Sequence, residues 1–501
     1  MAAIASGVLI VGLDGTITAV ANPVLAADLG ATLSGLQWIT NIYLLAMAAT
    51  LVLSGKLGDR LGRRRVFMTG VVGFGVASAT IAMAPAVSVV IAGRLGQGLF
   101  GALIVTNAVA LLRETFPPSQ LPKALSVFSA LIGASAATGP LIGGFLIEHT
   151  SWRWAFLINV PIAAVSIIAS LRLLPKGKLS TGASFDVLGA VLLGAGLLGI
   201  TYGLIDGAES GWGEVHVVAL IVIGVVLAVA FVFAERRAKD PLTPLRLFAD
   251  RNISLGLVLS AMSFFALVGA MFFILLFLQQ VNGDSPMQAG LHFLPLSVAN
   301  VVAAAVCGRI LVRFGARPPL VAGMALTAIG FVLFTRLEPH QAYIELMVPF
   351  VLLGFGVGLV MTSSVQSVIG SAAVDDAGPA AGAQQTALQI GGILGTSGLG
   401  AVMAYVVGSR FGPAMVDEGV PDATVDALAG GAVRSVGQGV PPALGGVDER
   451  AVSAVERATE ITFMDGLHMS MWVGAAVALT AAVLALFLKP GPVVDTGPSV
   501  H

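Results

Sequence analysis

Long runs of apolar residues, separated by short polar and charged stretches, make up most of this chain. A helix needs about 20 consecutive apolar residues to cross the hydrocarbon core of a bilayer. We find fourteen runs of about that length, and the pattern predicts an all-α integral membrane protein with fourteen transmembrane helices. The predicted spans lie near residues 2–27, 36–54, 66–84, 87–112, 122–147, 154–174, 186–206, 215–234, 253–278, 288–311, 318–336, 342–369, 380–408 and 467–488.

The composition agrees with this prediction. Of 501 residues, 56% are hydrophobic and 11% are charged, whereas soluble domains carry about 25% charged residues. The mean hydropathy is +0.94. The first run has the length of a secretory signal, but no base precedes it and Asp14 interrupts its centre, so we expect a retained span. The single cysteine, Cys307, excludes an intramolecular disulfide.

Lysines and arginines gather in alternate connections between the predicted spans. Because cytoplasmic loops of membrane proteins collect these residues, the connections after even-numbered spans are predicted to be cytoplasmic, together with both termini. The segment 409–466 between spans 13 and 14 is then an extracellular loop. It is rich in Gly, Pro and acidic residues, which favours a solvated tether, with recruitment of cations or partners as the alternative.

The most strongly charged stretch, GKLGDRLGRRR at 55–65, has a weaker copy later in the chain. It follows span 2, and Gly308–Arg317 follows span 10. A second pair of similar stretches is also eight spans apart: Leu95–Gly98 in span 4 and Leu353–Gly356 in span 12. Parallel repeats of this kind build transporters whose two halves rock about a central site. The expected domains are two six-helix bundles and a pair of inserted helices between them, at 1–174, 253–488 and 186–234.

The 55–65 hairpin resembles the signature sequence of the major facilitator superfamily. Further motifs are similar to those of its drug:proton antiporter branch with fourteen spans, and they occur in order along the chain: Leu13–Ile17, Arg94–Gly98, Gly133–Gly144, Trp152–Trp154, Asn159–Pro161 and Ser285–Gly290. This resemblance covers essentially the whole chain. It implies the major facilitator fold, with two six-helix bundles plus two inserted helices, and proton-coupled export of small molecules.

Two charged residues lie in the middle of predicted spans. Asp14 is in span 1, where a carboxylate costs roughly 2.5–3.5 kcal/mol on insertion scales. Because burial disfavours the charged form of an acid, Asp14 is a candidate proton carrier, with a carboxylate that is merely hydrogen-bonded in the bundle as the alternative. Arg94 in span 4 needs an acid, a carbonyl or water there. The resemblance implies a proton-relay role for Arg94, and a purely structural arginine is the alternative.

Two motifs are candidates for conformational control. In the 55–65 hairpin, the resemblance implies a latch that holds the cytoplasmic side closed, while the bases also anchor the topology. In span 5, small residues let helices approach closely and a proline interrupts the backbone hydrogen bonds. The resemblance makes this the antiporter motif, a hinge or a tight contact between the halves, and plain packing is the alternative. The latch residues are Gly55, Asp59, Arg60, Gly62, Arg63 and Arg64. The antiporter-motif residues are Gly133, Gly139, Pro140, Gly143 and Gly144.

Substrate contacts are expected from aromatic, methionine and uncharged polar side chains in the spans. Span 9 has no ionisable residue and is rich in Phe and Met, which suit apolar or cationic compounds through adaptable contacts and cation–π attraction. In span 1, polar residues follow Asp14 at i+4 and i+8, on one helix face. The candidates are Thr18, Asn22, Asn41, Tyr43, Phe265, Met271, Phe272, Gln279, Gln366 and Gln389.

These observations predict a proton-coupled antiporter that exports drugs or amphipathic small molecules by alternating access. The alternative is a dedicated exporter of a single metabolite, antibiotic, siderophore or lipid. The six histidines are scattered without the spacing of metal ligands, so neither an enzyme nor a metal site is expected. A channel is not expected either, because the chain has no repeated filter sequence. We expect protons as the coupling ion without a cofactor, an amphipathic or cationic substrate, no nucleic acid, and a monomer in the cell (inner/plasma) membrane.

Overall fold

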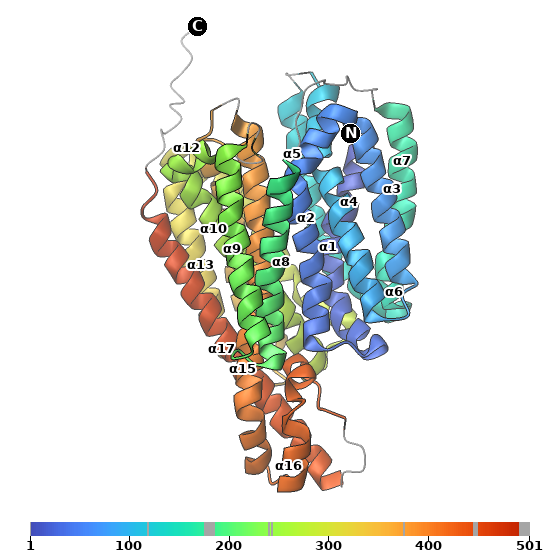
Figure 1. The fold of residues 1–501 in the computed structure, drawn as a ribbon, viewed down its shortest axis with the longest axis vertical. Coiled ribbons are helices and arrows are strands. Elements are labelled where there is room, and N and C mark those ends of the chain that lie inside the picture. The colour runs from blue at the N-terminus through green and yellow to red at the C-terminus, as the bar shows by residue number, and fades with distance from the viewer. Residues whose placement is uncertain are drawn as a thin grey trace.

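The computed structural model describes residues 2–117, 120–174, 186–238, 241, 244–373, 376–443 and 449–489. Within these ranges the secondary structure is helical, without strands, and Figure 1 shows an elongated helical bundle. Each of the fourteen predicted spans coincides with one helix or with consecutive helices. By length and composition, 12 described helices can cross a membrane, and α2, taken as one bent span, raises the number to 13. The fifth predicted span corresponds to α5, several of whose side chains lie outside the described part.

The helices fall into three groups along the chain. The first half contains α1 (Ala2–Leu29), α2 (Leu33–Leu61), α3 (Arg63–Ala82), α4 (Val87–Thr115), α5 (Leu121–His149), α6 (Trp152–Leu157) and α7 (Asn159–Leu173). The inserted pair is α8 (Val187–Ser210) and α9 (Val215–Arg237). The second half contains η1 (Leu245–Ala249), α10 (Arg251–Leu276), η2 (Phe277–Val281), α11 (Pro286–His292), α12 (Leu294–Phe314), α13 (Arg317–Phe334), α14 (Tyr343–Val368), α15 (Ala377–Asp417), α16 (Asp422–Ala429), η4 (Ala432–Arg434), η5 (Val436–Gln438) and α17 (Glu449–Ala485).

Small polar residues and glycine mark the points where the chain turns between helices. Thr32 Oγ1 accepts a hydrogen bond from the backbone N–H of Gly35 at 3.2 Å, which satisfies a free donor at the start of α2. Gly62 alone links α2 to α3 with φ at +93°, a conformation that glycine adopts without strain. At the start of α11, Ser285 and Gln288 form a capping box, in which each side chain binds the other residue's backbone.

The start of α1 and the end of α17 lie at the same end of the bundle, and α16 lies at the opposite end (Figure 1). We call these the α2–α3 end, after the 55–65 hairpin, and the α16 end. Both α15 and α17 run past the predicted spans into the segment 409–466, which is therefore largely helical where it is described. Its helices pack through buried apolar residues such as Phe411 and Ala458. Ion pairs also link them at the surface, with N–O distances of 2.6 Å for Arg410–Asp465 and for Arg457–Glu418. A solvated tether was the wrong expectation for these residues.

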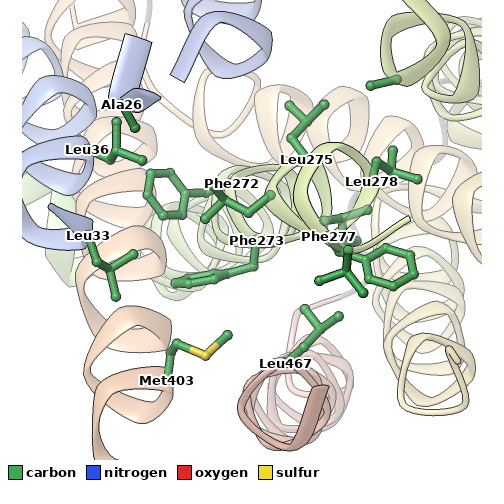
Figure 2. Close-up of a cluster of buried hydrophobic side chains, with 14 of the residues drawn as sticks. Ala26, Leu33, Leu36, Phe272, Phe273, Leu275, Phe277, Leu278, Met403 and Leu467 are labelled. Carbon is green, nitrogen blue, oxygen red and sulfur yellow. The ribbon is translucent and has the colours of Figure 1, made fainter. Parts of the chain in front are cut away.

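An apolar core joins the two halves at the α16 end (Figure 2). Leu33 and Leu36 from α2 face Phe272 and Phe273 from α10, with Met403 from α15 beside them. All five side chains are buried. The halves are therefore packed together firmly at this end of the molecule.

The inserted pair lies along the junction of the two halves. Helix α8 packs against α2 of the first half and α15 of the second. Helix α9 packs on α8 through glycines, since a β-carbon at Gly224 would lie 2.8 Å from the Gly196 carbonyl oxygen. Many of the large apolar side chains of α9, including Val222 and Val226, are exposed, as expected for a helix that faces lipid.

Candidate functional site

Asp14 lies midway along α1 and is 1% exposed. Its Oδ2 forms an ion pair with the guanidinium of Arg94 on α4. Its Oδ1 accepts hydrogen bonds from Gln97 Nε2 at 2.7 Å and from Asn159 Nδ2 at 3.0 Å. The acid that Arg94 was expected to need is thus present, together with two amides. Gln97 and Asn159 belong to two of the sequence motifs, but the sequence predicts no role for either of them.

Ser78 on α3 completes this network. Its hydroxyl oxygen accepts from Gln97 Nε2 at 2.8 Å and from Asn159 Nδ2 at 3.2 Å. Each amide nitrogen therefore directs one hydrogen to Asp14 and the other to Ser78. All of these side chains are at most 2% exposed. Ser78 had no sequence signal, because a lone serine in an apolar helix usually bonds only to its own backbone.

Arg94 has further partners that do not depend on Asp14. Its NH1 donates to Gln97 Oε1 at 2.8 Å, and its Nε donates to the carbonyl oxygen of Ile39 on α2 at 3.0 Å. The guanidinium lies 4.2 Å from the centre of the Tyr43 ring. A proton on Asp14 would remove the charge that pairs with Arg94, while these other contacts keep the arginine in place. The network can therefore exist in two protonation states with different internal bonding.

The 55–65 hairpin is held against the first half of the molecule. Asp59 pairs with Arg63 at 2.8 Å, and Arg63 Nε lies 3.3 Å from a carboxylate oxygen of Glu114 on α4. Arg64 donates to the carbonyl oxygen of Leu171 on α7 at 2.8 Å. All three of these contacts stay within the first half. They fix the turn against its own bundle.

The antiporter motif on α5 has two contact faces. A β-carbon at Gly143 would lie 3.2 Å from Ile17 Cγ2, and one at Gly139 would overlap the Thr16 hydroxyl, so both face α1. A β-carbon at Gly144 would lie 2.7 Å from Met287 Cα on α11 and would overlap the Pro286 carbonyl oxygen. Gly144 therefore faces the opposite half.

Pro140 and Glu148 extend this contact between the halves. A β-carbon at Gly290 on α11 would lie 2.9 Å from the carbonyl carbon of Pro140. One turn beyond Gly144, Glu148 Oε2 accepts from Ser285 Oγ at 2.5 Å and from the Met287 N–H at 3.1 Å. The motif thus forms a backbone-to-backbone contact between α5 and α11 at the α16 end. Gly133 takes no part in it, since within the described part of the chain nothing would lie within 4 Å of a β-carbon there.

A polar seam runs between α2 and α15, which belong to opposite halves. Gln37 Nε2 donates to the carbonyl oxygen of Thr396 at 3.0 Å, and the Thr396 hydroxyl donates to Asn41 Oδ1. Further along, Gln389 Nε2 lies 3.4 Å from Met47 Sδ. Among the described residues, two buried amide atoms on the seam have no hydrogen-bond partner, Asn41 Nδ2 and Gln389 Oε1.

The other predicted substrate contacts are distributed over the molecule. Thr18 donates to the carbonyl oxygen of Asp14 at 2.8 Å, and Gln279 donates to that of Val20 at 3.1 Å. Asn22 is buried and bonds to Thr40 at 3.4 Å, while Asn22 Oδ1 finds no partner in the described structure. The remaining candidates lie in the apolar core, against the guanidinium of Arg94, or at the surface. Phe272 is buried in the apolar core, Phe265 and Met271 are partly buried against it, Tyr43 is stacked on Arg94, and Gln366 is exposed.

Comparisons with known proteins agree with this architecture. The sequence profile of the Major Facilitator Superfamily matches residues 4–396. The chain is 39% identical over 490 residues to the tetracenomycin C resistance and export protein of Streptomyces glaucescens, covering 97% of this chain and 90% of that protein. It is 30% identical to the multidrug transporter protein MdtP of Bacillus subtilis, covering 95% and 90% respectively. It is 32% identical to the multidrug efflux pump LfrA of Mycolicibacterium smegmatis, covering 80% and 79%.

A solved structure shows the same fold at low sequence identity. A bacterial homologue of the human lysosomal transporter Spinster superposes with a TM-score of 0.64 and 16% identity, covering 98% of both chains.

Proposed function

This chain belongs to the Major Facilitator Superfamily, and from that premise we propose how its buried Asp14 network drives export. The protein is a multi-pass efflux transporter of the cell membrane, and its relatives include multidrug pumps as well as exporters of a single antibiotic. The observation that supports the coupling site is the buried ion pair of Asp14 and Arg94 with its shell of Gln97, Asn159 and Ser78. We assign proton coupling to Asp14 and Arg94.

In the proposed cycle, a proton that enters from outside neutralises Asp14 and weakens its attachment to Arg94. Loss of the proton to the cytoplasm restores the anion and the pair. The membrane potential supplies about 2.3 kcal/mol for each charge moved through 100 mV. Because the network joins α1, α3, α4 and α7, a change in its bonding acts on the packing of the whole first half.

We further propose that the α2–α3 end is cytoplasmic, with both termini, and that the α16 end is outside. The gathering of bases on the connections at the α2–α3 end supports this orientation. The halves are 1–174 and 253–488, with the inserted pair 186–234 packed across their junction. One chain contains both halves, so we propose a monomer as the working unit.

Two contacts take conformational roles in this proposal. The tight α5–α11 contact at Gly144 and Gly290 closes the outer side. The latch residues Gly55, Asp59, Arg60, Gly62, Arg63 and Arg64 close the cytoplasmic side in the opposite conformation. In this structure Asp59 pairs with Arg63 in its own hairpin, which supports a latch whose acid is paired within the first half.

For the substrate, we propose an amphipathic small molecule that lies between the halves, in contact with Asn22, Asn41 and Gln389. A dedicated exporter of one antibiotic is the second candidate, because the relative at 39% identity is named for tetracenomycin C. Growth of a sensitive host that expresses the protein separates the two. Protection against unrelated compounds indicates multidrug efflux, and protection against one scaffold indicates a dedicated exporter.

The proposal is tested with Asp14→Asn in everted membrane vesicles. We expect drug-induced proton flux to fall to the level of vesicles without the protein, because asparagine cannot take up the coupled proton. As a control, Asp206→Asn removes an acid of α8 that pairs with His216 at 2.7 Å, outside the Asp14 network, and the flux should persist.

A folding control accompanies this test. Loss of one partner from a buried pair costs roughly 3–5 kcal/mol, so Asp14→Asn also destabilises the protein. The double variant Asp14→Asn/Arg94→Gln leaves no unpaired charge and should recover thermal stability without recovering flux. Full proton-coupled transport by Asp14→Asn would show that Asp14 is not the coupling group.

A further inference from the structure

We infer that His292 and Asp284 form a second proton-binding site, on the outer side of the second half, and that a proton held there stabilises the α5–α11 contact. Histidine is the side chain whose charge changes near neutral pH. The inference rests on the function proposed above, since it takes the α16 end as the outer side. It adds a proton-binding group to the half of the molecule that lacks Asp14.

The two side chains come from opposite ends of α11. Asp284 lies just before the start of this helix, and His292 is its last residue. His292 Nδ1 is 2.7 Å from Asp284 Oδ2, and the side chains are 18% and 11% exposed. This is the distance of an ion pair, although the alignment falls short of a hydrogen bond and neither atom has another partner among the described residues. A carboxylate oxygen and a ring nitrogen without hydrogen are both acceptors and repel each other, whereas a positively charged ring attracts the carboxylate.

The surroundings of the pair hold both partners in place. The Asp284 N–H donates to the carbonyl oxygen of Leu278 at 2.8 Å, and Asp284 Oδ1 accepts from Asn282 Nδ2 at 3.2 Å, which leaves Oδ2 for His292. Leu278 lies in η2, a single turn of π-helix, a feature that is frequent at functional sites. The His292 ring stacks on that of Tyr343 on α14, with ring centres 4.3 Å apart. A charged His292 ring therefore has a carboxylate and an aromatic face beside it, and both attract a cation.

Other titratable groups around α11 have partners of their own. Helix α11 packs against α1, α5, α12, α14 and η2. Within the described ranges, the acids and the histidine that these elements carry at the α16 end bind as follows: Asp28 to Arg153, Glu148 to Ser285 and Met287, His149 to the carbonyl oxygen of Phe145, and Glu345 to Gln341. Asp284 is therefore the acid that a proton on His292 would engage.

The pair spans the helix that closes the outer side. Only seven residues make up α11, and its backbone lies against Gly144 and Pro140 of α5. Because this contact is backbone to backbone, it requires α11 in one position. A proton on His292 ties the end of α11 to Asp284 before its start, and loss of the proton removes this attraction. A proton from outside therefore favours the closed outer side, in addition to neutralising Asp14.

The experiment measures the opening of the outer side. Spin labels on Thr150→Cys, after α5, and Glu338→Cys, before α14, report the separation of the halves by double electron–electron resonance, and both native side chains are exposed. The full chain also carries Cys307→Ala and Asp14→Asn/Arg94→Gln, so that protonation of Asp14 does not contribute. A charge-assisted hydrogen bond is worth about tenfold or more in an equilibrium. The ratio of separated to closed molecules should therefore rise about tenfold from about pH 5 to about pH 8.

Two variants of the pair and one control complete this measurement. His292→Gln should abolish the rise, because glutamine takes up no proton. Asp284→Asn should reduce it, because the charged ring loses its partner. His149→Gln is the matched control, since it removes a histidine of α5 at the same end of the molecule, whose ring nitrogen lies 3.0 Å from the carbonyl oxygen of Phe145. With this variant the rise should persist.

A second measurement does not depend on the folding of His292→Gln. Nuclear magnetic resonance of the wild-type chain with labelled histidine nitrogens follows the six rings, and the signals of His292 are those that Asp284→Asn changes. We expect this ring to become doubly protonated as the pH falls from about 8 to about 5. A ring that stays neutral, or an undiminished rise in His292→Gln, overturns the inference while leaving export driven by Asp14 intact. Full proton-coupled transport by Asp14→Asn in vesicles would instead overturn the proposed function.

Discussion

At the scale of single residues, the buried carboxylate of Asp14 is held by three polar partners. Arg94 supplies the opposite charge, and the amides of Gln97 and Asn159 supply two hydrogen bonds to Oδ1. These neighbours hold the carboxylate in one position at the centre of the first half. Changing one of them should therefore alter coupled export without removing the acid.

Asn159→Leu is the corresponding prediction. It removes one charge-assisted hydrogen bond, worth about 1.5–3 kcal/mol, from the anion of Asp14. The initial rate of coupled export should therefore fall, because the carboxylate of Asp14 is positioned less firmly. The measurement is the initial rate of export in vesicles under an imposed pH gradient.

Ser166→Ala is the matched control for this variant. Ser166 lies on the same helix, α7, and its hydroxyl donates to the carbonyl oxygen of Ala3 at 3.0 Å, away from Asp14. Ser166→Ala should lower stability slightly and leave the rate of coupled export unchanged. An unchanged rate for Asn159→Leu would mean that this amide has no part in coupling.

At the scale of helices, the two halves meet backbone to backbone where α5 contacts α11. Gly144→Val should abolish export, because its side chain meets the backbone of Pro286 and Met287 and not a movable side chain. The outer side would then fail to close. A cysteine at position 285 reports on this closure, because Ser285 lies at the α5–α11 contact. In a Cys307→Ala background, Ser285→Cys should react faster with an impermeant maleimide when Gly144→Val is also present.

Gly133 provides the comparison within the same helix. A β-carbon there would meet open space within the described part of the chain, so Gly133→Ala should keep both transport and the slow maleimide reaction. Equal behaviour of the two variants would show that the α5–α11 contact has no part in closing the outer side.

The inserted pair allows a second prediction about helix packing. Gly224→Leu should separate α9 from α8, since a β-carbon at this position already lies 2.7 Å from the Ile200 backbone nitrogen. Overpacking of this kind costs typically about 1–3 kcal/mol, and we expect a lower unfolding temperature in detergent. Val226→Leu, on the exposed face of α9, is the control and should leave that temperature unchanged.

The helices and the candidate site were predictable from the sequence to different degrees. The spans follow from the length of each run of apolar residues, which is a property of consecutive residues, and all fourteen predicted spans coincide with helices. Asp14 and Arg94 were predictable because charge in a span is costly. Ser78 was not, since its role depends on how α3 is rotated against α4 and α7. The helical extension was missed because α15 and α17 pack through apolar residues distant in sequence: Phe411 and Met415 of α15 are buried in the same cluster as Val455 and Ala458 of α17.

At the scale of the whole molecule, the two halves are joined at the α16 end by polar bonds as well as by the apolar core. Glu148 on α5 binds Ser285 and Met287 of the second half, and Gln37 on α2 binds Thr396 on α15. Packed interfaces of this kind switch between discrete arrangements and do not deform continuously. Alternating access therefore requires that the contacts at this end break in every cycle.

A cross-link tests that requirement. In a Cys307→Ala background, Glu148→Cys with Ser285→Cys places a thiol on each side of a contact where the native side chains meet at 2.5 Å. Because cysteine is shorter than glutamate, a bifunctional methanethiosulfonate is used to span the two thiols. Cross-linking should tether the halves and stop export, and reduction should restore it, since the tether forbids only the separation of α5 from α11. Arg410→Cys with Asp465→Cys is the matched control, because these residues meet at 2.6 Å within the second half. The control bridge should form and leave export unchanged, and continued export with the Glu148–Ser285 bridge in place would show that the halves need not part at this end.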